Sequence, residues 1–371
     1  MKIAFITGAR ADYGPFRSTL KGISEEKNFN LDIIVHGMHL MKLYGNSVEE
    51  IKKDKFGKII KLNTLKKDIN KSDEMIKTIK VLHNFLKSSS YDLVILVGDR
   101  LETYAGAIAS HFAKIPILHS GGGHITSGAV DNIYRFNITN FAKYHFTTSI
   151  KANDCLKNIP SINKDKLFFI GSPTVDAIKK FLKSPLRIES FVPDLLNKRY
   201  VLMTFHPLTL IKEPIVEILE ASINFLMKKN ISVLITYPNN DESSKDIRVC
   251  IDAIKKNKNV YAERHLGSLG YYTAIKYSEF IFGNSSSGIM EAPYFNKHVV
   301  NVGTRQEGRA LDRSITNVSA KVGNVIKILN KLVDGKIRLL KNEKLYGNGT
   351  AVDRSIKILN TISIEESKNK N

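Results

Sequence analysis

Residues 72–102, SDEMIKTIKVLHNFLKSSSYDLVILVGDRLE, contain the pattern that decides the fold. Over residues 72–86, apolar side chains recur at helical spacing behind Ser72, a candidate N-cap that two acidic residues follow. Residues 92–99 then read DLVILVGD, an apolar run of strand length without polar alternation. A strand that is apolar on both faces is typical of a parallel sheet covered by helices on both sides. The stretch therefore predicts an α/β protein.

The same alternation of helix and strand continues along the chain. Similar apolar runs lie at residues 2–8, 31–37, 115–122, 144–149, 166–172, 200–207, 232–239, 279–286 and 298–303. A second amphipathic segment spans residues 213–229. This order predicts doubly wound parallel sheets with right-handed crossovers. The pattern weakens over residues 182–198, which carry two prolines, so we expect two Rossmann-like domains, residues 1–180 and 199–350, facing each other across a cleft.

Composition narrows the class of protein. The chain has 371 residues, 43% hydrophobic and 25% charged, which suits two packed domains. The net charge of +20 comes mostly from lysines scattered along amphipathic helices, so we expect no nucleic-acid partner. The first apolar run is too short for a signal peptide or a membrane span, and Cys155 and Cys250 form no CxxC, so we expect a cytoplasmic protein without disulfides. Since GxGxxG, GxxxxGK[ST] and HExxH are absent, we expect no dinucleotide cofactor and no metal.

The loop in FIFGNSSSGIMEAPYF, residues 280–295, is the strongest candidate for phosphate binding. A buried strand ends at Gly283, and small residues then lead into an expected short helix that includes Glu291. Small residues let backbone N–H groups approach an anion at the positive end of a helix. The predicted phosphate ligands are Ser285, Ser286, Ser287 and Gly288. Glu291 would accept a hydrogen bond from a ribose hydroxyl; the alternative is that the serines only cap the helix.

Other polar residues also stand at strand ends, where an α/β fold places its ligand site. Arg305 and Arg309 follow the run at 298–303, and either side chain could reach a pyrophosphate. His206 ends the first strand of the second half, where it could donate to a phosphate or titrate near neutral pH. Asp99 directly follows the strand at 92–98 and is a candidate acid or base.

Together these loops resemble a known family. The motifs are TGARADYG, VHGMHL, VGDRLE, GSPTVD, TFHPLT, TYPNND, GNSSSGIMEAP and NVGTRQEGR, which run in order from residue 7 to residue 309. They resemble the hydrolysing UDP-N-acetylglucosamine 2-epimerases of sialic and legionaminic acid biosynthesis. The resemblance implies two Rossmann-like domains of the glycosyltransferase-B type, with residues 351–365 as a helix that crosses back to the first domain. It also implies a homodimer or homotetramer.

The resemblance further implies a reaction on a nucleotide sugar. The diphosphate leaves C1, C2 loses its proton to give a glycal, and water adds back with the configuration at C2 inverted. The positions that match diphosphate-binding motifs are Arg10, His206, Asn239, Ser286, Ser287 and Arg309. Asp99 and Asp131 match the family's acid–base positions, and Glu102 lies close in the sequence.

The stretch HSGGGHITSGAVD, residues 119–131, departs from the family pattern His-x-(Glu or His)-Gly-Gly-Glu. Gly121 stands at the acidic or histidine position, His124 replaces the last glutamate, and Phe136 stands where a histidine is common, whereas Arg135 is retained. Three interpretations follow. In the first, His124 acts as the acid–base group, since an imidazole with an ordinary pKa of about 6.5 suits neutral pH. In the second, Asp99, Glu102 and Asp131 suffice for acid–base catalysis and His124 only positions the substrate. In the third, the elimination reaction is lost.

Two other functions remain open from the sequence. A glycosyltransferase could use the same two-domain scaffold, because fold alone does not decide function. A nucleotide-sugar-binding protein without turnover would fit the missing acid–base residues. A requirement for an acceptor would identify the first, and tight binding without turnover would identify the second.

Overall fold

The computed structural model describes residues 1–42, 46–65, 70–126, 130–208, 213–238, 244–264 and 266–368. The chain divides into two compact units. The first comprises Met1–Ile125, Val130–Ala177 and Tyr346–Asn371, and the second is built on Ile178–Leu345. The division falls inside helix α7 (Pro173–Lys183), so the proline-containing segment 182–198 belongs to the second unit.

The described part of the first unit forms a seven-stranded sheet of order β3-β2-β1-β4-β5-β6-β7. Its strands are β1 (Lys2–Thr7), β2 (Asn30–Val35), β3 (Lys58–Lys61), β4 (Leu93–Val97), β5 (Ile117–Ser120), β6 (Tyr144–Thr147) and β7 (Leu167–Phe169). Neighbouring strands pair in parallel, as the register from Lys2↔Asn30 to Thr7↔Val35 illustrates. The parallel sheet predicted from the apolar runs is confirmed.

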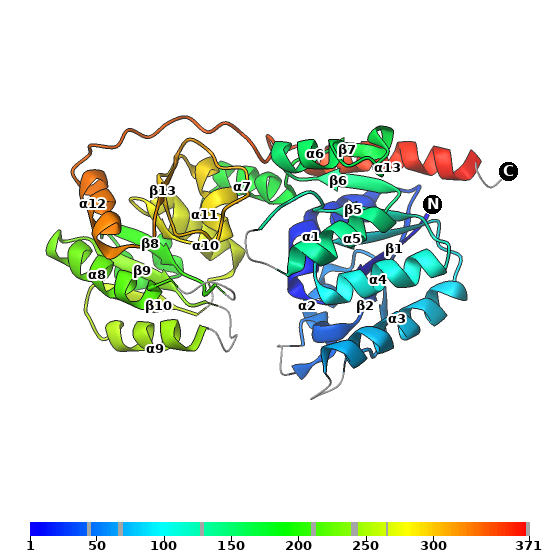
Figure 1. Cartoon of the computed structure of the whole chain (residues 1–371), viewed down its shortest axis with the longest axis horizontal. Helices are drawn as coiled ribbons and strands as arrows, with labels where there is room; N and C mark the ends of the chain where they lie inside the picture. The colour runs from blue at the N-terminus through cyan, green and yellow to red at the C-terminus, as the bar shows by residue number, and fades with distance from the viewer. Residues whose placement is uncertain are drawn as a thin grey trace. The chain divides into compact units, whose positions relative to one another are not determined.

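Helices cover both faces of this sheet (Figure 1). They are α1 (Arg10–Glu25), α2 (Val48–Asp54), α3 (Lys71–Lys87), α4 (Leu101–Phe112), α5 (Asp131–Phe141), α6 (Ile150–Lys157) and α13 (Ala351–Lys368), with short 3-10 turns at Gly37–Leu40 and Lys164–Lys166. Ile3 and Phe5 of β1 pack into a core with α1, α2 and α13. Ala4 and Ile6 pack into a second core with α3, α4 and α5. The alternation along β1 explains why the strand is apolar at every position.

Helix α3 differs in detail from its prediction. Its N-cap is Asn70, whose side chain accepts a hydrogen bond from the amide of Asp73. Ser72 lies inside the first turn and donates to Asn70 Oδ1, so the prediction of a Ser72 cap is wrong. Ile76, which was expected on the buried face, is 65% exposed, while Leu82 and Leu86 are buried.

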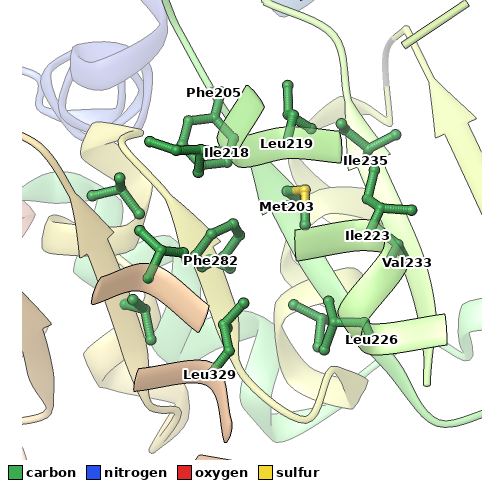
Figure 2. Close-up of a cluster of buried hydrophobic side chains, with 14 of the residues drawn as sticks. Met203, Phe205, Ile218, Leu219, Ile223, Leu226, Val233, Ile235, Phe282 and Leu329 are labelled. Atoms are coloured by element: carbon green, nitrogen blue, oxygen red, sulfur yellow. The ribbon is translucent and has the colours of Figure 1, made fainter. Parts of the chain in front are cut away.

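The second unit repeats the plan with a six-stranded sheet, counted over its described residues, of order β10-β9-β8-β11-β12-β13. Its strands are β8 (Tyr200–Thr204), β9 (Ser232–Thr236), β10 (Val260–Glu263), β11 (Ile281–Gly283), β12 (Val299–Val302) and β13 (Ile315–Val318). Its helices are α8 (Ile215–Lys228), α9 (Lys245–Ile254), α10 (Gly267–Tyr277), α11 (Ser286–Met290) and α12 (Val322–Val333), with 3-10 turns at Ile188–Ser190, Pro193–Leu195 and Ala292–Phe295. Figure 2 shows its core, in which Met203, Phe282 and Leu329 pack with side chains of α8.

Helix α13 follows the second unit in the chain and packs against α1 in the first. Asp176 caps it: its two carboxylate oxygens accept from the amides of Ala351 (3.0 Å) and Val352 (3.1 Å). Leu359 and Ile362 are buried in the same core as α1. No helix among the described residues combines the length and apolar character that a bilayer crossing requires.

Candidate active site

Both sheets have a topological switch point between two adjacent central strands. The segment after one of these strands crosses one face of the sheet, and the segment after the other crosses the opposite face. In the first unit the switch point lies between β1 and β4, and in the second between β8 and β11. Most of the site residues expected from the sequence lie in the loops that leave these strands. These residues form two groups, one in each unit.

Arg135 organises the first unit's group, although the sequence indicated only that it is retained. It lies on α5 and is 3% exposed. Its Nη1 donates to the carbonyl oxygen of His124 (2.5 Å) and to Asn132 Oδ1 (2.6 Å), and its Nη2 donates to Asp99. Because a buried guanidinium requires an anionic partner, the ion pair fixes Asp99 beside the backbone of His124. Two of the predicted catalytic residues, Asp99 and His124, are thus brought together.

The ring of His124 has a hydrogen-bonding partner of its own. Its Nε2 lies 2.8 Å from the hydroxyl of Thr148, which follows β6. An imidazole whose backbone and ring are both anchored presents a fixed geometry for proton transfer. Thr148 could not be predicted from the sequence, because its contact with His124 requires β5 and β6 to be neighbours in the sheet.

The glycines around His124 explain why the loop carries so few side chains. Gly121 has φ +95° and Gly123 has φ +81°, values that strain any L side chain. A Cβ on Gly123 would also lie 2.3 Å from the carbonyl oxygen of Ala152. An acidic residue at position 121 would therefore be strained in this loop. His124 is the titratable side chain that directly follows the three glycines. Phe136 is half-buried on α5 and supplies no imidazole.

His119, which matches the first histidine of the family pattern, is fully buried. Its Nε2 lies 2.8 Å from the carbonyl oxygen of Gly98, and its Nδ1 lies 3.0 Å from the hydroxyl of Thr139. Burial lowers the pKa of His119 to about 4, so the ring is neutral at neutral pH. Its contacts tie the end of β5 to the loop that carries Asp99.

Glu102 and Asp131 are the other predicted catalytic residues in the first unit; the fifth, His206, lies in the second unit. Glu102 is buried in the first turn of α4, and its Oε2 lies 3.6 Å from Arg100 Nε. Asp131 begins α5; partial burial and then the charge of Asp99 raise its pKa. A raised carboxyl pKa is expected where acidic groups crowd together, and it favours an acid–base role.

The second unit's group centres on Asn284, which the sequence analysis did not single out. Its side chain accepts from the amide of His206 (2.7 Å) and donates to the carbonyl of the same residue (2.9 Å). The ends of β8 and β11 are thereby joined. Burial, and then Arg305, lower the pKa of His206 to about 4, so the expectation that it titrates near neutral pH is wrong. A neutral imidazole still has one N–H to donate.

The serine loop, residues 284–288, caps helix α11 in this structure. Ser285 is the N-cap of α11 and accepts from the amide of Ser287 (3.4 Å), while its hydroxyl lies 2.9 Å from Ser287 Oγ. Ser287 Oγ lies 2.5 Å from the hydroxyl of Tyr271. Ser286 and the buried Gly288 lie within the five-residue helix. Glu291 follows the helix as its C-cap, so its expected place inside the helix is wrong.

Two arginines gather beside this loop. Arg305 Nη1 donates to the carbonyl oxygen of Asn284 (3.0 Å), and the buried Gln306 donates to the same oxygen (2.8 Å). Arg309 Nη1 lies 3.5 Å from the sulfur of Met290. Burial and then the charge of Arg309 lower the pKa of Arg305 to about 10. Two mutually repelling cations in one loop are suited to an anion.

A pocket of about 300 Å³ lies next to the serine loop. Its lining residues are Thr236, Arg264, Leu266, Gly267, Ser268, Tyr271, Tyr272 and Glu291. Burial raises the pKa of Glu291 to about 7. Of these residues, only Glu291 was predicted as a ligand from the sequence. The others lie on β9, on the loop after β10 and on α10, which come together only when the chain folds.

The remaining two predicted nucleotide ligands are not part of these groups. Arg10, at the start of α1, is 54% exposed and forms an ion pair with Glu50 (2.7 Å). It lies near the switch point of the first unit, where an exposed pair costs little to exchange for a ligand. Asn239 lies outside the described residues.

Two parallel α/β units with polar switch points define a class, the two-domain nucleotide-sugar enzymes of the glycosyltransferase-B type. The model of the family described as UDP-N-acetylglucosamine 2-epimerase matches residues 21–360. The chain is 31% identical to the UDP-N,N'-diacetylbacillosamine 2-epimerase (hydrolyzing) of Legionella pneumophila, covering 98% of this chain and 96% of that protein. It is 32% identical to a polysialic acid biosynthesis protein of Escherichia coli, with 90% and 87% covered.

A solved structure agrees in fold. The UDP-GlcNAc 2-epimerase of Neisseria meningitidis, bound to UDP-GlcNAc, superposes with a TM-score of 0.82 at 20% identity, covering 97% of this chain and all of that one. The chain belongs to the UDP-N-acetylglucosamine 2-epimerase family. The predicted family and the predicted two-domain α/β fold are confirmed.

Proposed function

We propose that this chain is a hydrolysing nucleotide-sugar 2-epimerase, which converts a nucleoside-diphosphate 2-acetamido sugar and water into a 2-acylaminomannose-type sugar and the nucleoside diphosphate. The observation that carries the proposal is the buried Arg135, which holds Asp99 and the backbone of His124 together at the ends of β4 and β5. Relatives named as hydrolysing 2-epimerases support the same reaction.

We assign the sugar to the first unit. Removing the proton from C2 requires a base, and returning a proton to the other face of C2 requires an acid. His124 and Asp99 are fixed close together, while Asp131 has a raised pKa, so the group includes members suited to either task. The electron pair of the C2–H bond forms the C1–C2 double bond as the C1–O bond breaks. Water then adds across that double bond, with its hydroxyl at C1 and a proton at C2.

We assign the nucleoside diphosphate to the second unit. Arg305 and Arg309 would neutralise the departing diphosphate, and His206 would donate its single N–H. The hydroxyls of Ser285, Ser286 and Ser287 with the amide of Gly288 would contact phosphate oxygens. The pocket beside them would hold the nucleoside, with Glu291 accepting from the ribose. Arg10 and Asn239 are further proposed phosphate ligands.

For the substrate we propose a UDP- or GDP-linked 2-acetamido sugar. One relative is named for UDP-N,N'-diacetylbacillosamine, and another, from Campylobacter jejuni, for the GDP or UDP form. The first substrates to try are therefore UDP-N-acetylglucosamine and UDP-N,N'-diacetylbacillosamine. We further propose a cytoplasmic homodimer or homotetramer, which light scattering of the purified protein would test.

The deciding experiment is NMR of the products formed in deuterated water. A 2-epimerase releases the free 2-epimerised sugar with deuterium at C2, together with the nucleoside diphosphate, and needs no acceptor. A glycosyltransferase would release sugar only onto an acceptor, and a binding protein would leave the nucleotide sugar intact. Unlabelled C2 in the released sugar would contradict elimination and rehydration.

A further inference from the structure

The turn after β1 contains a carboxyl group that the proposed reaction does not use. Asp12, on α1, is 2% exposed. Its Oδ2 accepts hydrogen bonds from the amides of Gly8 (3.1 Å) and Ala9 (3.0 Å). Its Oδ1 is equally buried and has no hydrogen-bond partner among the described residues. An unpaired carboxylate oxygen in this setting is costly when charged and tolerable when it carries a proton.

Asp12 lies in a cluster with Glu102, a proposed acid–base residue. Gly8 separates the two side chains: a Cβ on Gly8 would lie 2.7 Å from Glu102 Cβ. On the other side, a Cβ on Gly98 would lie 3.9 Å from Asp12 Oδ1. The cation that faces both carboxyl groups is Arg100, whose Nε lies 3.6 Å from Glu102 Oε2. Two buried carboxyl groups therefore share one guanidinium.

Other charged or titratable groups also face this cluster. From α3, Glu74 interacts with Glu102 and Arg100, and burial and then the charge of Glu102 raise its pKa. Asp99 and Asp131 also interact with Arg100, and Asp99 is paired with Arg135.

From the β2 side, His36 and His39 approach the turn, and burial lowers their pKa values to about 3 and about 4. On α1 itself, Arg10 pairs with Glu50 and Arg17 pairs with Asp54. Arg100 is thus the cation that interacts with both Asp12 and Glu102, and further carboxyl groups compete for it.

We propose that Asp12 is a positioning residue of the active site, which keeps a proton on Oδ1 so that it does not compete with Glu102 for Arg100. The proposal rests on the epimerase function proposed above. Burial and then the charge of Glu102 raise the pKa of Asp12 to about 7, so its proton is exchanged near neutral pH. When Asp12 ionises, two carboxylates compete for Arg100 and Glu102 loses its fixed position.

The test compares Asp12→Asn with the wild type over pH 5.5 to 9. The asparagine oxygen can still accept from both amides, and its NH2 group replaces the protonated oxygen. We expect wild-type kcat/KM to fall by about tenfold per pH unit above pH 7, and the Asp12→Asn variant to lack that fall. The control is Asp32→Asn, which alters a buried aspartate bonded to Tyr91 outside the cluster and should keep the wild-type profile.

A purely structural Asp12 would give a variant whose activity is lowered equally at every pH, and that outcome overturns the proposal. A second measurement needs no turnover: the carboxyl carbon resonances of the wild type and of Asp12→Asn, both labelled with carbon-13 at aspartate. One resonance that is absent from Asp12→Asn should titrate near pH 7, and titration of that resonance below pH 5 also overturns the proposal. If that resonance titrates but no sugar is released, the proposed function fails while the protonated Asp12 stands.

Discussion

The two units share one strand order but place different groups beside the same point of it. Counting from the first strand, both sheets run 3-2-1-4 and onward. Beside that switch point the first unit gathers the carboxyl groups of Asp12, Asp99 and Glu102 around Arg100 and Arg135. In the second unit, Arg305 reaches the end of β11 from the loop after β12, with Arg309 in the same loop. The comparison teaches that topology determines where a ligand binds, and that the loop residues determine what chemistry occurs there.

In each group, burial first and a neighbouring like charge second shift the pKa of a charged side chain. The pKa of Asp12 and of Asp131 is raised in the first unit, and the pKa of Arg305 is lowered in the second. These shifts suit the first group to carrying protons and the second to binding an anion. Variants of the first unit should therefore change turnover, and variants of the second should change nucleotide affinity.

The largest effect is expected for His124→Ala. Loss of a general acid or base costs about 10²–10⁴-fold in rate, so release of the 2-epimerised sugar should nearly vanish. UDP affinity, measured by calorimetry, should stay within twofold because the second unit is untouched. The matched control is His111→Ala on α4, which should retain full turnover. Near-normal turnover in His124→Ala would show instead that Asp99, Glu102 and Asp131 suffice.

A smaller loss, about 10²-fold in kcat, is expected for Arg135→Lys. The lysine keeps the charge but cannot reach Asp99, Asn132 and the His124 carbonyl at once, so the reacting groups shift. Steady-state kinetics measure the effect, and Arg199→Lys, in an exposed pair with Glu279, is the control. A change in KM with unchanged kcat would contradict the assignment of Arg135 to the chemical step.

Arg309→Ala should weaken UDP binding by at least about tenfold, because a charge-assisted hydrogen bond is worth roughly 1.5–3 kcal/mol. The dissociation constant, measured by calorimetry, should rise while the melting temperature stays close to that of the wild type. Arg313→Ala, which breaks an exposed pair with Glu343, serves as the control. Unchanged UDP affinity would show that Arg309 is not a phosphate ligand and would weaken the assignment of diphosphate binding to the second unit.

The smallest effect is expected for Arg10→Ala, about threefold in UDP affinity, since this exposed arginine is screened by solvent. Glu50→Ala releases Arg10 from its ion pair and should change the free energy of unfolding by less than about 1 kcal/mol. Calorimetry and chemical denaturation measure the two effects. If Arg10→Ala lowered UDP affinity as much as Arg309→Ala does, the first unit would contribute to phosphate binding as strongly as the second.

The central strands could be predicted from sequence because both of their faces are buried. Every apolar run that we assigned to a strand forms one. The strands that we missed, β3, β10 and β13, lie at sheet edges, where one neighbour is absent and the sequence is less apolar. β3 reads KIIK, with two exposed lysines. The N-cap at Asn70 was missed because Ser72 offered an equally plausible signal two residues later.

The predicted site was strongest where a polar residue directly follows a buried strand. Asp99 and His124 follow neighbouring strands, so their proximity depends on strand order alone. Asn284 holds His206 across 78 residues of sequence, and Arg264 and Tyr271 meet Glu291 in a pocket built from separate elements. Such contacts depend on tertiary structure, which local sequence patterns do not encode.

The position of α13 has a consequence for how the chain folds as the ribosome makes it. Its buried Leu359 and Ile362 complete the core around α1, and Lys143 and Lys166 form ion pairs with Glu366 and Glu365 near its C-terminal end. The first unit is translated first, yet it lacks this helix until the whole second unit has been synthesised. The main segment of the second unit, Ile178–Leu345, can fold during translation, so the first unit is completed after it.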